Sequence, residues 1–318
     1  MNHLESSFKG RNAFWRYLLL MASVLIATNT IGSIPLLISM GKKVAGDPEI
    51  AARVAANPTD LSILGIDLNA GLVMMLFPFI IGLATFLLLI KPLNNKTLLT
   101  VINGTGSFRW RKFFISAFVW IILSSIYLIA YIKIDPSNFT LNNTTDTLII
   151  LVIVSIFLIP FQAAYEEIIY RGYLMQGFTL LVRYRWFPLI LTSSLFALRH
   201  GLNPEVSEYG FLTMMPQYLL FGLIFGIITI LDDGIEAAWG AHAANNIFLC
   251  IFVTNESSVL KTPALYVQHT IYPWTEFIIM LCMGILAIFI LKIIFRWKDL
   301  SVIFKKVEPG ENVLSQVP

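Results

Sequence analysis

Charged residues are scarce in this chain of 318 amino acids, because Asp, Glu, Lys and Arg together make up only 13% of it. Soluble domains usually carry about 25% charge. The net charge of +3 is small and is spread over several loops, so the sequence offers no basic patch for nucleic acid. Hydrophobic residues make up 57% of the chain. This composition predicts a protein that lies in a lipid bilayer and crosses it several times.

Several catalytic and metal-binding signatures are also missing. The two cysteines, Cys250 and Cys282, lie in apolar stretches, and their spacing matches neither a zinc site nor a disulfide framework. No Gly-x-Ser-x-Gly turn marks a serine hydrolase, and no His-Glu-x-x-His motif marks a zinc protease. We therefore expect no cofactor and no bound metal. The first apolar run lacks a small-residue cleavage site, which predicts a retained helix rather than a signal peptide.

The chain contains many long apolar runs. A membrane-spanning helix needs roughly 20 mostly apolar residues. Eight stretches meet or approach this length, which predicts an all-α, polytopic bundle of about eight transmembrane helices. The fifth and seventh stretches are short, and the fourth is expected to continue as a helix to about residue 178. The stretches are 17–39, 70–90, 113–132, 147–168, 187–200, 212–231, 236–253 and 274–295.

Basic residues gather in alternate connecting segments. Because cytoplasmic loops carry an excess of Lys and Arg, this pattern predicts a multi-pass plasma-membrane protein with both termini in the cytoplasm, and the lean loops favour a bacterial membrane. The acidic turn Asp232-Asp233-Gly234 is an exception, but acidic residues weigh little in this rule. The segments on the basic side contribute Lys9, Arg11, Arg16, Lys91, Lys96, Arg109, Arg111, Lys112, Arg183, Arg185, Arg296, Lys298, Lys305 and Lys306.

Three patterns place polar and ionisable side chains inside the apolar stretches. A carboxylate or guanidinium at the centre of a membrane helix costs roughly 2.5–3.5 kcal/mol. A Leu, Ile or Phe offsets only about 0.3–0.6 kcal/mol of that. Groups this unfavourable in a membrane are candidates for function. The patterns are Glu166-Glu167 with Arg171, Phe196 with Arg199-His200, and His242 with Asn246.

The first pattern separates two neighbouring carboxyl groups. Residues four apart share a helix face, so Glu167 and Arg171 can form an ion pair. Glu166 is rotated by about 100° from Glu167 and has no helical cation partner. It is therefore free to take a proton from water and later return it. The alternative is a structural charge cluster that ties helices together.

The second and third patterns add imidazole and amide groups. His242 and Asn246 leave the same face of one helix and can both donate hydrogen bonds to one developing oxyanion. Membrane bundles also use such residues as interhelical hydrogen-bond partners. His200, four residues after Phe196, can accept a proton or orient a water, although a single helical histidine is more often structural. The adjacent Arg199 requires a cavity or an interface.

Together these residues form a complete set of groups for attack of water on an amide. A purely structural role is reasonable for each pattern taken singly. If all three roles were structural, one Glu, two His and one Asn from three separate helices would have to meet by accident. The residues alone do not decide which histidine activates water and which stabilises the oxyanion.

At these motifs the chain resembles the CAAX prenyl protease and bacteriocin-processing family of intramembrane glutamic endopeptidases. That family carries Glu-Glu-x-x-x-Arg, Phe-x-x-x-His and His-x-x-x-Asn motifs in this order, and the resemblance covers about 147–253. It implies a cavity open toward the cytoplasm, in which Glu166 and His200 activate water. The same resemblance assigns His242 and Asn246 to the oxyanion, with Glu167, Arg171 and Phe196 in support.

We accordingly divide the chain into N-terminal membrane helices with a polar loop (1–146), a catalytic core (147–253) and a last transmembrane helix with a basic tail (254–318). The leading hypothesis is a metal-independent endopeptidase that cleaves a membrane-associated, prenylated or leader peptide. One alternative is a zinc hydrolase with Glu166, His200 and His242 as ligands. The other is a non-catalytic membrane regulator or immunity-type protein.

Overall fold

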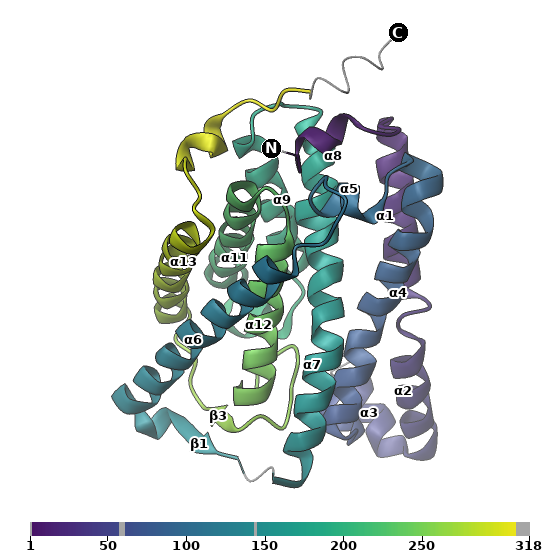
Figure 1. The fold of residues 1–318 in the computed structure, drawn as a ribbon. Helices are drawn as coiled ribbons and strands as arrows, with labels where there is room; N and C mark the ends of the chain where they lie inside the picture. The colour runs from purple at the N-terminus through teal and green to yellow at the C-terminus, as the bar shows by residue number, and fades with distance from the viewer. Residues whose placement is uncertain (1, 57–60, 143–144, 310–318) are drawn as a thin grey trace.

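The computed structural model describes residues 2–56, 61–142 and 145–309, and within them helices dominate (Figure 1). Each of the eight apolar stretches forms helix, which confirms the all-α membrane bundle. The α-helices are α1 (Phe14–Asn29), α2 (Ile34–Gly46), α3 (Pro48–Ala56), α4 (Leu68–Asn94), α5 (Leu98–Ile102), α6 (Trp110–Ile134), α7 (Thr145–Glu167), α8 (Met175–Thr179), α9 (Trp186–Arg199), α10 (Pro204–Tyr209), α11 (Phe211–Asp232), α12 (Glu236–Phe252) and α13 (Pro273–Phe295).

Among the residues that the structure describes, six helical segments are long and apolar enough to cross a membrane. The other two expected stretches, α9 and α12, have 14 and 17 residues. α12 lies inside the bundle, where it packs mainly against α6 and α7. A short helix can be accommodated there because its neighbours, rather than lipid, cover its ends. The longest segment joins α7, the π-helix Ile168–Leu174 and α8 into one continuous element that ends at Thr179, as expected.

One expectation about the N-terminal part is wrong. The first span is not one helix, because the chain breaks between Asn29 and Ile34 to give α1 and α2. The N-terminal segment before α1 is packed against the rest of the protein. Residues Glu5–Phe8 form a 3-10 helix, and His3 is only 1% exposed. Its backbone N–H donates to the Asp233 carboxylate at 3.0 Å, so this segment is fastened to the turn between α11 and α12.

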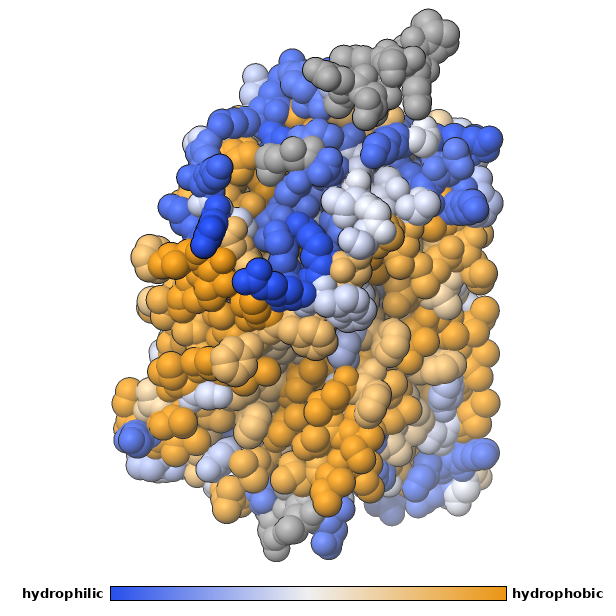
Figure 2. All heavy atoms as spheres, viewed as in Figure 1, coloured by the Kyte–Doolittle hydropathy of each residue, from blue (hydrophilic) through white to orange (hydrophobic). Residues whose placement is uncertain are grey.

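The first and last described residues of the chain, together with α5 and α8, lie at the same end of the bundle (Figure 1), which we call the termini face. Hydrophilic residues gather at this end, and a broad hydrophobic surface lies beneath it (Figure 2). The acidic turn at Asp232 also lies at this face, where basic side chains balance its negative charge. Lys112 Nζ lies 2.6 Å from the Asp232 carboxylate, and Arg109 bridges Asp232 and Glu236.

At the opposite end, three short strands form a sheet that the sequence did not predict. β1 (Phe139–Leu141) pairs antiparallel with β3 (Tyr266–Gln268), and β3 pairs in parallel with β2 (Val253–Thr254). Phe139 faces Gln268 in this register, and Val253 faces Tyr266. The sheet thus links the ends of α6 and α12 to the segment that leads into α13. We call this end the strand face.

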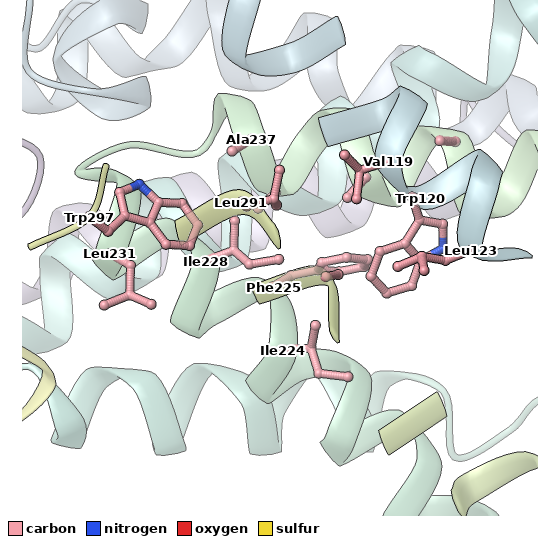
Figure 3. Close-up of a cluster of buried hydrophobic side chains, with 14 residues drawn as sticks. Val119, Trp120, Leu123, Ile224, Phe225, Ile228, Leu231, Ala237, Leu291 and Trp297 are labelled. Carbon is pink, nitrogen blue, oxygen red and sulfur yellow. The ribbon is translucent and has the colours of Figure 1, made fainter. Parts of the chain in front are cut away.

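The core between α6, α11, α12 and α13 is a continuous apolar cluster (Figure 3). The ring centroids of Trp120 and Phe225 are 5.2 Å apart, and Ile228 is fully buried beside them. Glycines let α12 approach α6 and let α11 approach α9 closely, as is common between membrane helices. A Cβ atom at Gly240 would lie 2.0 Å from the Phe113 backbone oxygen, and one at Gly222 would lie 2.9 Å from Ser193.

Candidate active site

The two glutamates stand at the end of α7, where the α-helix passes into the π-helix Ile168–Leu174. Single π-turns inside helices are frequent at functional sites. The ion pair expected from the four-residue spacing is present, with Arg171 Nη1 2.9 Å from Glu167 Oε1. Both side chains are buried, and the Arg171 guanidinium also lies 4.4 Å from the ring centroid of Phe196. Glu167 is therefore held in one position.

His242, on α12, lies between the two carboxyl groups. Its Nδ1 is 2.7 Å from Glu167 Oε1, and its Nε2 is 3.5 Å from Glu166 Oε2. The imidazole stacks on Phe225 at a centroid distance of 5.2 Å, which fixes the ring plane. Because an ionised carboxylate only accepts hydrogen bonds, we assign the Nδ1 hydrogen to the contact with Glu167. Nε2 is then directed at Glu166.

His200 caps the C-terminal end of α9 and is held differently. Its Nδ1 lies 2.7 Å from the Phe196 carbonyl oxygen, which can only accept, so Nδ1 carries the hydrogen. The ring lies between Phe196 and Tyr218, with both centroid distances at 4.5 Å. In the neutral imidazole, Nε2 is then an acceptor with no hydrogen-bond partner among the described residues. Such a nitrogen can accept a hydrogen bond, or a proton, from water.

Asn246 lies one helical turn after His242, and its amide is oriented by two neighbours. Its Nδ2 donates to Gln162 Oε1 at 2.8 Å, and its Oδ1 accepts from Asn245 Nδ2 at 3.0 Å. Asn245 is itself fixed, because its Oδ1 accepts from Trp120 Nε1 at 3.0 Å. An amide nitrogen has two hydrogens, so Asn246 keeps one donor for another acceptor.

These side chains surround one cavity of about 500 Å³. Glu166, Phe196, His200, His242 and Asn246 all line it, whereas Glu167 and Arg171 lie behind its wall. A continuous series of polar contacts joins Glu166, His242, Glu167 and Arg171. Phe196 connects this series to His200, because it touches His200, the Arg171 guanidinium and, at 6.3 Å between ring centroids, His242.

Two residues that orient the candidate groups were missed in the sequence. Gln162 precedes Glu166 by four residues, so its polar side chain on the same helix face was an available signal. Tyr218 stacks on His200 from α11, and it donates to the Glu205 carboxylate. Nothing in the local sequence around Tyr218 indicates this contact, because it depends on how α9 and α11 pack.

The zinc alternative requires Glu166, His200 and His242 to converge on one ion. Within the parts of the chain that the structure describes, no group of three or more His, Cys, Asp and Glu side chains has a geometry that could hold a metal ion. Metal analysis of the purified protein is the direct test of this alternative.

The membrane helices and the polar cavity between them define a polytopic membrane protein with an internal site. Residues 145–248 match the family model described as type II CAAX prenyl endopeptidase Rce1-like. The chain is also 31% identical over 264 residues to the uncharacterized protein YyaK of Bacillus subtilis (strain 168), across 81% of this chain and 84% of YyaK. No solved structure matches the chain. The chain belongs to the Rce1-like family of type II CAAX prenyl endopeptidases.

Proposed function

We propose that the chain is an intramembrane endopeptidase in which Glu166 and His200 activate the attacking water. The observation that carries the proposal is the arrangement of side chains from α7, α9 and α12 around one cavity, with His242 held between two carboxyl groups. The region 147–253, which supplies these helices, is the proposed catalytic unit. A peptide or protein substrate at the membrane is the proposed partner.

In the proposed first step, water in the cavity donates hydrogen bonds to Glu166 and to the free Nε2 of His200. Glu166 accepts a proton as the water oxygen attacks the carbonyl carbon of the scissile peptide bond. The carbonyl oxygen becomes an oxyanion, which needs donors that are already in place. Asn246 supplies its second amide hydrogen for this purpose.

His242 is the second proposed oxyanion donor. The Glu167 carboxylate on Nδ1 orients the ring. In the doubly protonated imidazole, Nε2 also carries a hydrogen and can donate it to the oxyanion. Collapse of the tetrahedral intermediate then breaks the C–N bond. Glu166 returns its proton to the leaving amine, and the products are a carboxylic acid and an amine. No step requires a metal ion.

The decisive experiment compares membrane peptides by mass spectrometry between cells that produce the parent protein and cells that produce Glu166→Gln. The matched control is Glu208→Gln, because Glu208 is exposed and does not line the cavity. We expect new peptide termini in the parent and in the control, and their loss in Glu166→Gln and in His200→Ala. Termini that persist in both site variants would reject the mechanism. A cellular effect that survives Glu166→Gln without any cleavage would instead indicate a non-catalytic regulator.

A further inference from the structure

A second carboxyl group lies on the cavity wall and has no part in the proposed mechanism. Glu276, in the first turn of α13, lines the cavity together with Glu166. The ion pairs among the described residues do not include Glu276, and Arg199, a basic residue on the same wall, forms none with it. An ionisable side chain in a membrane helix indicates a functional site, and its expected partner is a group of opposite charge.

Neighbouring polar side chains hold the Glu276 carboxyl group in place but do not saturate it. The Tyr127 hydroxyl of α6 donates to its Oε2 at 2.7 Å, and the Gln268 amide of β3 donates to its Oε1 at 3.4 Å. A carboxylate has about four acceptor positions, so two remain open. Gln217 of α11 lines the cavity as well, and its Nε2 donates to the Pro273 carbonyl oxygen at 2.6 Å. Its Oε1 has no hydrogen-bond partner among the described residues.

The surrounding wall is suited to a long side chain that ends in a positive charge. Lysine and arginine side chains carry only hydrogen-bond donors, and the open positions on Glu276 and Gln217 are acceptors. Aromatic rings attract cations to their faces, and the rings of Tyr127 and Phe139 line this part of the cavity. The apolar side chains of Ile279 and Met280 line it too. They would cover the aliphatic part of a lysine or arginine.

We propose that Glu276, Tyr127, Gln217 and Gln268 form a subsite that binds a lysine or arginine side chain of the peptide substrate. We call it the Glu276 subsite. This inference rests on the proposed peptidase function and narrows its substrate class to peptides with a basic residue near the cleaved bond. The substrate cation supplies the charge partner that the protein does not provide for Glu276.

The position of Tyr127 on α6 sets the distance between this subsite and the catalytic candidates. Trp120, on the same helix, donates to Asn245, which holds the amide of Asn246. Tyr127 follows Trp120 by seven residues, which at 1.5 Å per residue is about 10 Å along the helix. An extended peptide advances roughly 3.3 Å per residue. The basic residue should therefore lie about three residues from the bond that is cleaved.

Peptide binding to Glu166→Gln tests the subsite directly. This variant keeps a peptide intact and also removes the Glu166 charge, so that carboxylate cannot attract a cation. The probes are blocked peptides of leucine and alanine that carry either lysine or norleucine, which lacks the ammonium group, three residues before or after the central bond. We expect at least tenfold tighter binding of a lysine peptide than of its norleucine counterpart.

Two added substitutions locate the source of this preference. In Glu166→Gln combined with Glu276→Gln, the ratio of the two affinities should fall to about one. Glu205→Gln is the matched control, because Glu205 is the remaining carboxylate on the cavity wall, and it should leave the ratio unchanged. The absence of any lysine preference, its persistence in Glu276→Gln or its loss only in Glu205→Gln would overturn the proposal. A purely structural Glu276, acting on the N-terminus of α13, would change Tm without changing the ratio.

Cross-linking tests the contact without altering Glu276. A carbodiimide joins a carboxyl group to a nearby amine as an amide, and peptide mapping by mass spectrometry identifies the carboxyl group that has reacted. In Glu166→Gln, we expect the lysine peptide to be joined to Glu276, and the norleucine peptide to remain free. A lysine peptide that is joined only to Glu205, or to no carboxyl group on the cavity wall, would overturn the proposal.

The cleaved sequences distinguish this inference from the proposed function. Glu166-dependent termini should be enriched in lysine or arginine about three residues from the cleaved bond, and Glu276→Lys should shift this preference to aspartate or glutamate. Glu166-dependent termini without such an enrichment would overturn the inference and leave the peptidase function intact. A lysine preference in binding and a cross-link to Glu276, without any Glu166-dependent termini, would uphold the subsite and reject the peptidase function.

Discussion

Replacing Arg171 with methionine would leave the Glu167 carboxylate buried without its cation. Arg171 and Glu167 are 1% and 0% exposed, and their closest atoms are 2.9 Å apart. Removing one partner of such a buried pair typically costs about 3–5 kcal/mol, because the other charge is left uncompensated. Removing both charges costs much less. Glu167→Gln combined with Arg171→Met should therefore be more stable than Arg171→Met alone.

Thermal unfolding of the detergent-purified protein, followed by tryptophan fluorescence, measures this coupling. A loss of 3–5 kcal/mol corresponds to a decrease in Tm of roughly 6–10 °C at about 2 °C per kcal/mol. The double variant should recover more than half of that decrease. It should still fail to cleave, because His242 loses the carboxylate that orients it. Arg111→Met is the control, since Arg111 is exposed and should change Tm little.

Two outcomes would refute this reasoning. If Arg171→Met melts at the same temperature as the parent, the buried ion pair contributes nothing measurable to stability. If the decreases for the two single substitutions simply add in the double variant, Glu167 and Arg171 are not coupled. Full cleavage activity in the double variant would show that His242 does not depend on Glu167.

Three further predictions follow from other parts of the molecule. Burial lowers the pKa of Lys96 from 10.5 to about 7, so the folded state binds fewer protons than the unfolded state between these values and stability should rise with pH across that window. Lys96→Met removes this titratable group, so the stability of the parent relative to Lys96→Met should increase by about 4 kcal/mol between pH 7 and pH 10. Melting curves of both proteins at rising pH measure this change, and a constant difference would contradict the assignment. Gly240→Ala should lower Tm by several degrees, because its Cβ would meet the Phe113 backbone. Gly106→Ala is the control and should leave Tm unchanged, because the space around Gly106 is open. Equal melting temperatures for the two variants would mean that α6 and α12 can separate at little cost. Treatment with EDTA should leave the Glu166-dependent cleavage unchanged, and its loss with recovery on adding zinc would favour the metal hydrolase.

Local spacing predicted the local part of the site. The four-residue separation of Glu167 and Arg171 gave their ion pair, because neighbours on a helix face meet whatever the rest of the bundle does. Apolar length likewise predicted the eight helices. The break between Asn29 and Ile34 was not predicted, since apolar residues continue across it and composition alone does not show where a helix ends.

The contacts between helices could not be predicted from one sequence. The stacking of Tyr218 on His200 and the hydrogen bond from Asn246 to Gln162 depend on the relative rotation and depth of separate helices. The direction in which the cavity opens depends on the same packing. The contact of His3 with Asp233 was not predicted either, because a polar N-terminal segment gives no local sign that a distant carboxylate will bind it.

The contacts of the N-terminal segment with later parts of the chain determine when that segment can pack during synthesis. Glu5 pairs with Arg185 at 2.7 Å, the backbone of Asn2 and His3 donates to Asp233, and Gln176 on α8 donates to the His3 carbonyl oxygen. The ribosome makes Asn2, His3 and Glu5 long before Arg185 and Asp233. Glu5 and the His3 carbonyl oxygen must therefore wait until the chain has been made as far as Arg185, and the backbone N–H groups of Asn2 and His3 must wait until Asp233 follows α11. The full set of these contacts at the termini face forms only once almost all the helices that carry the catalytic candidates are in place.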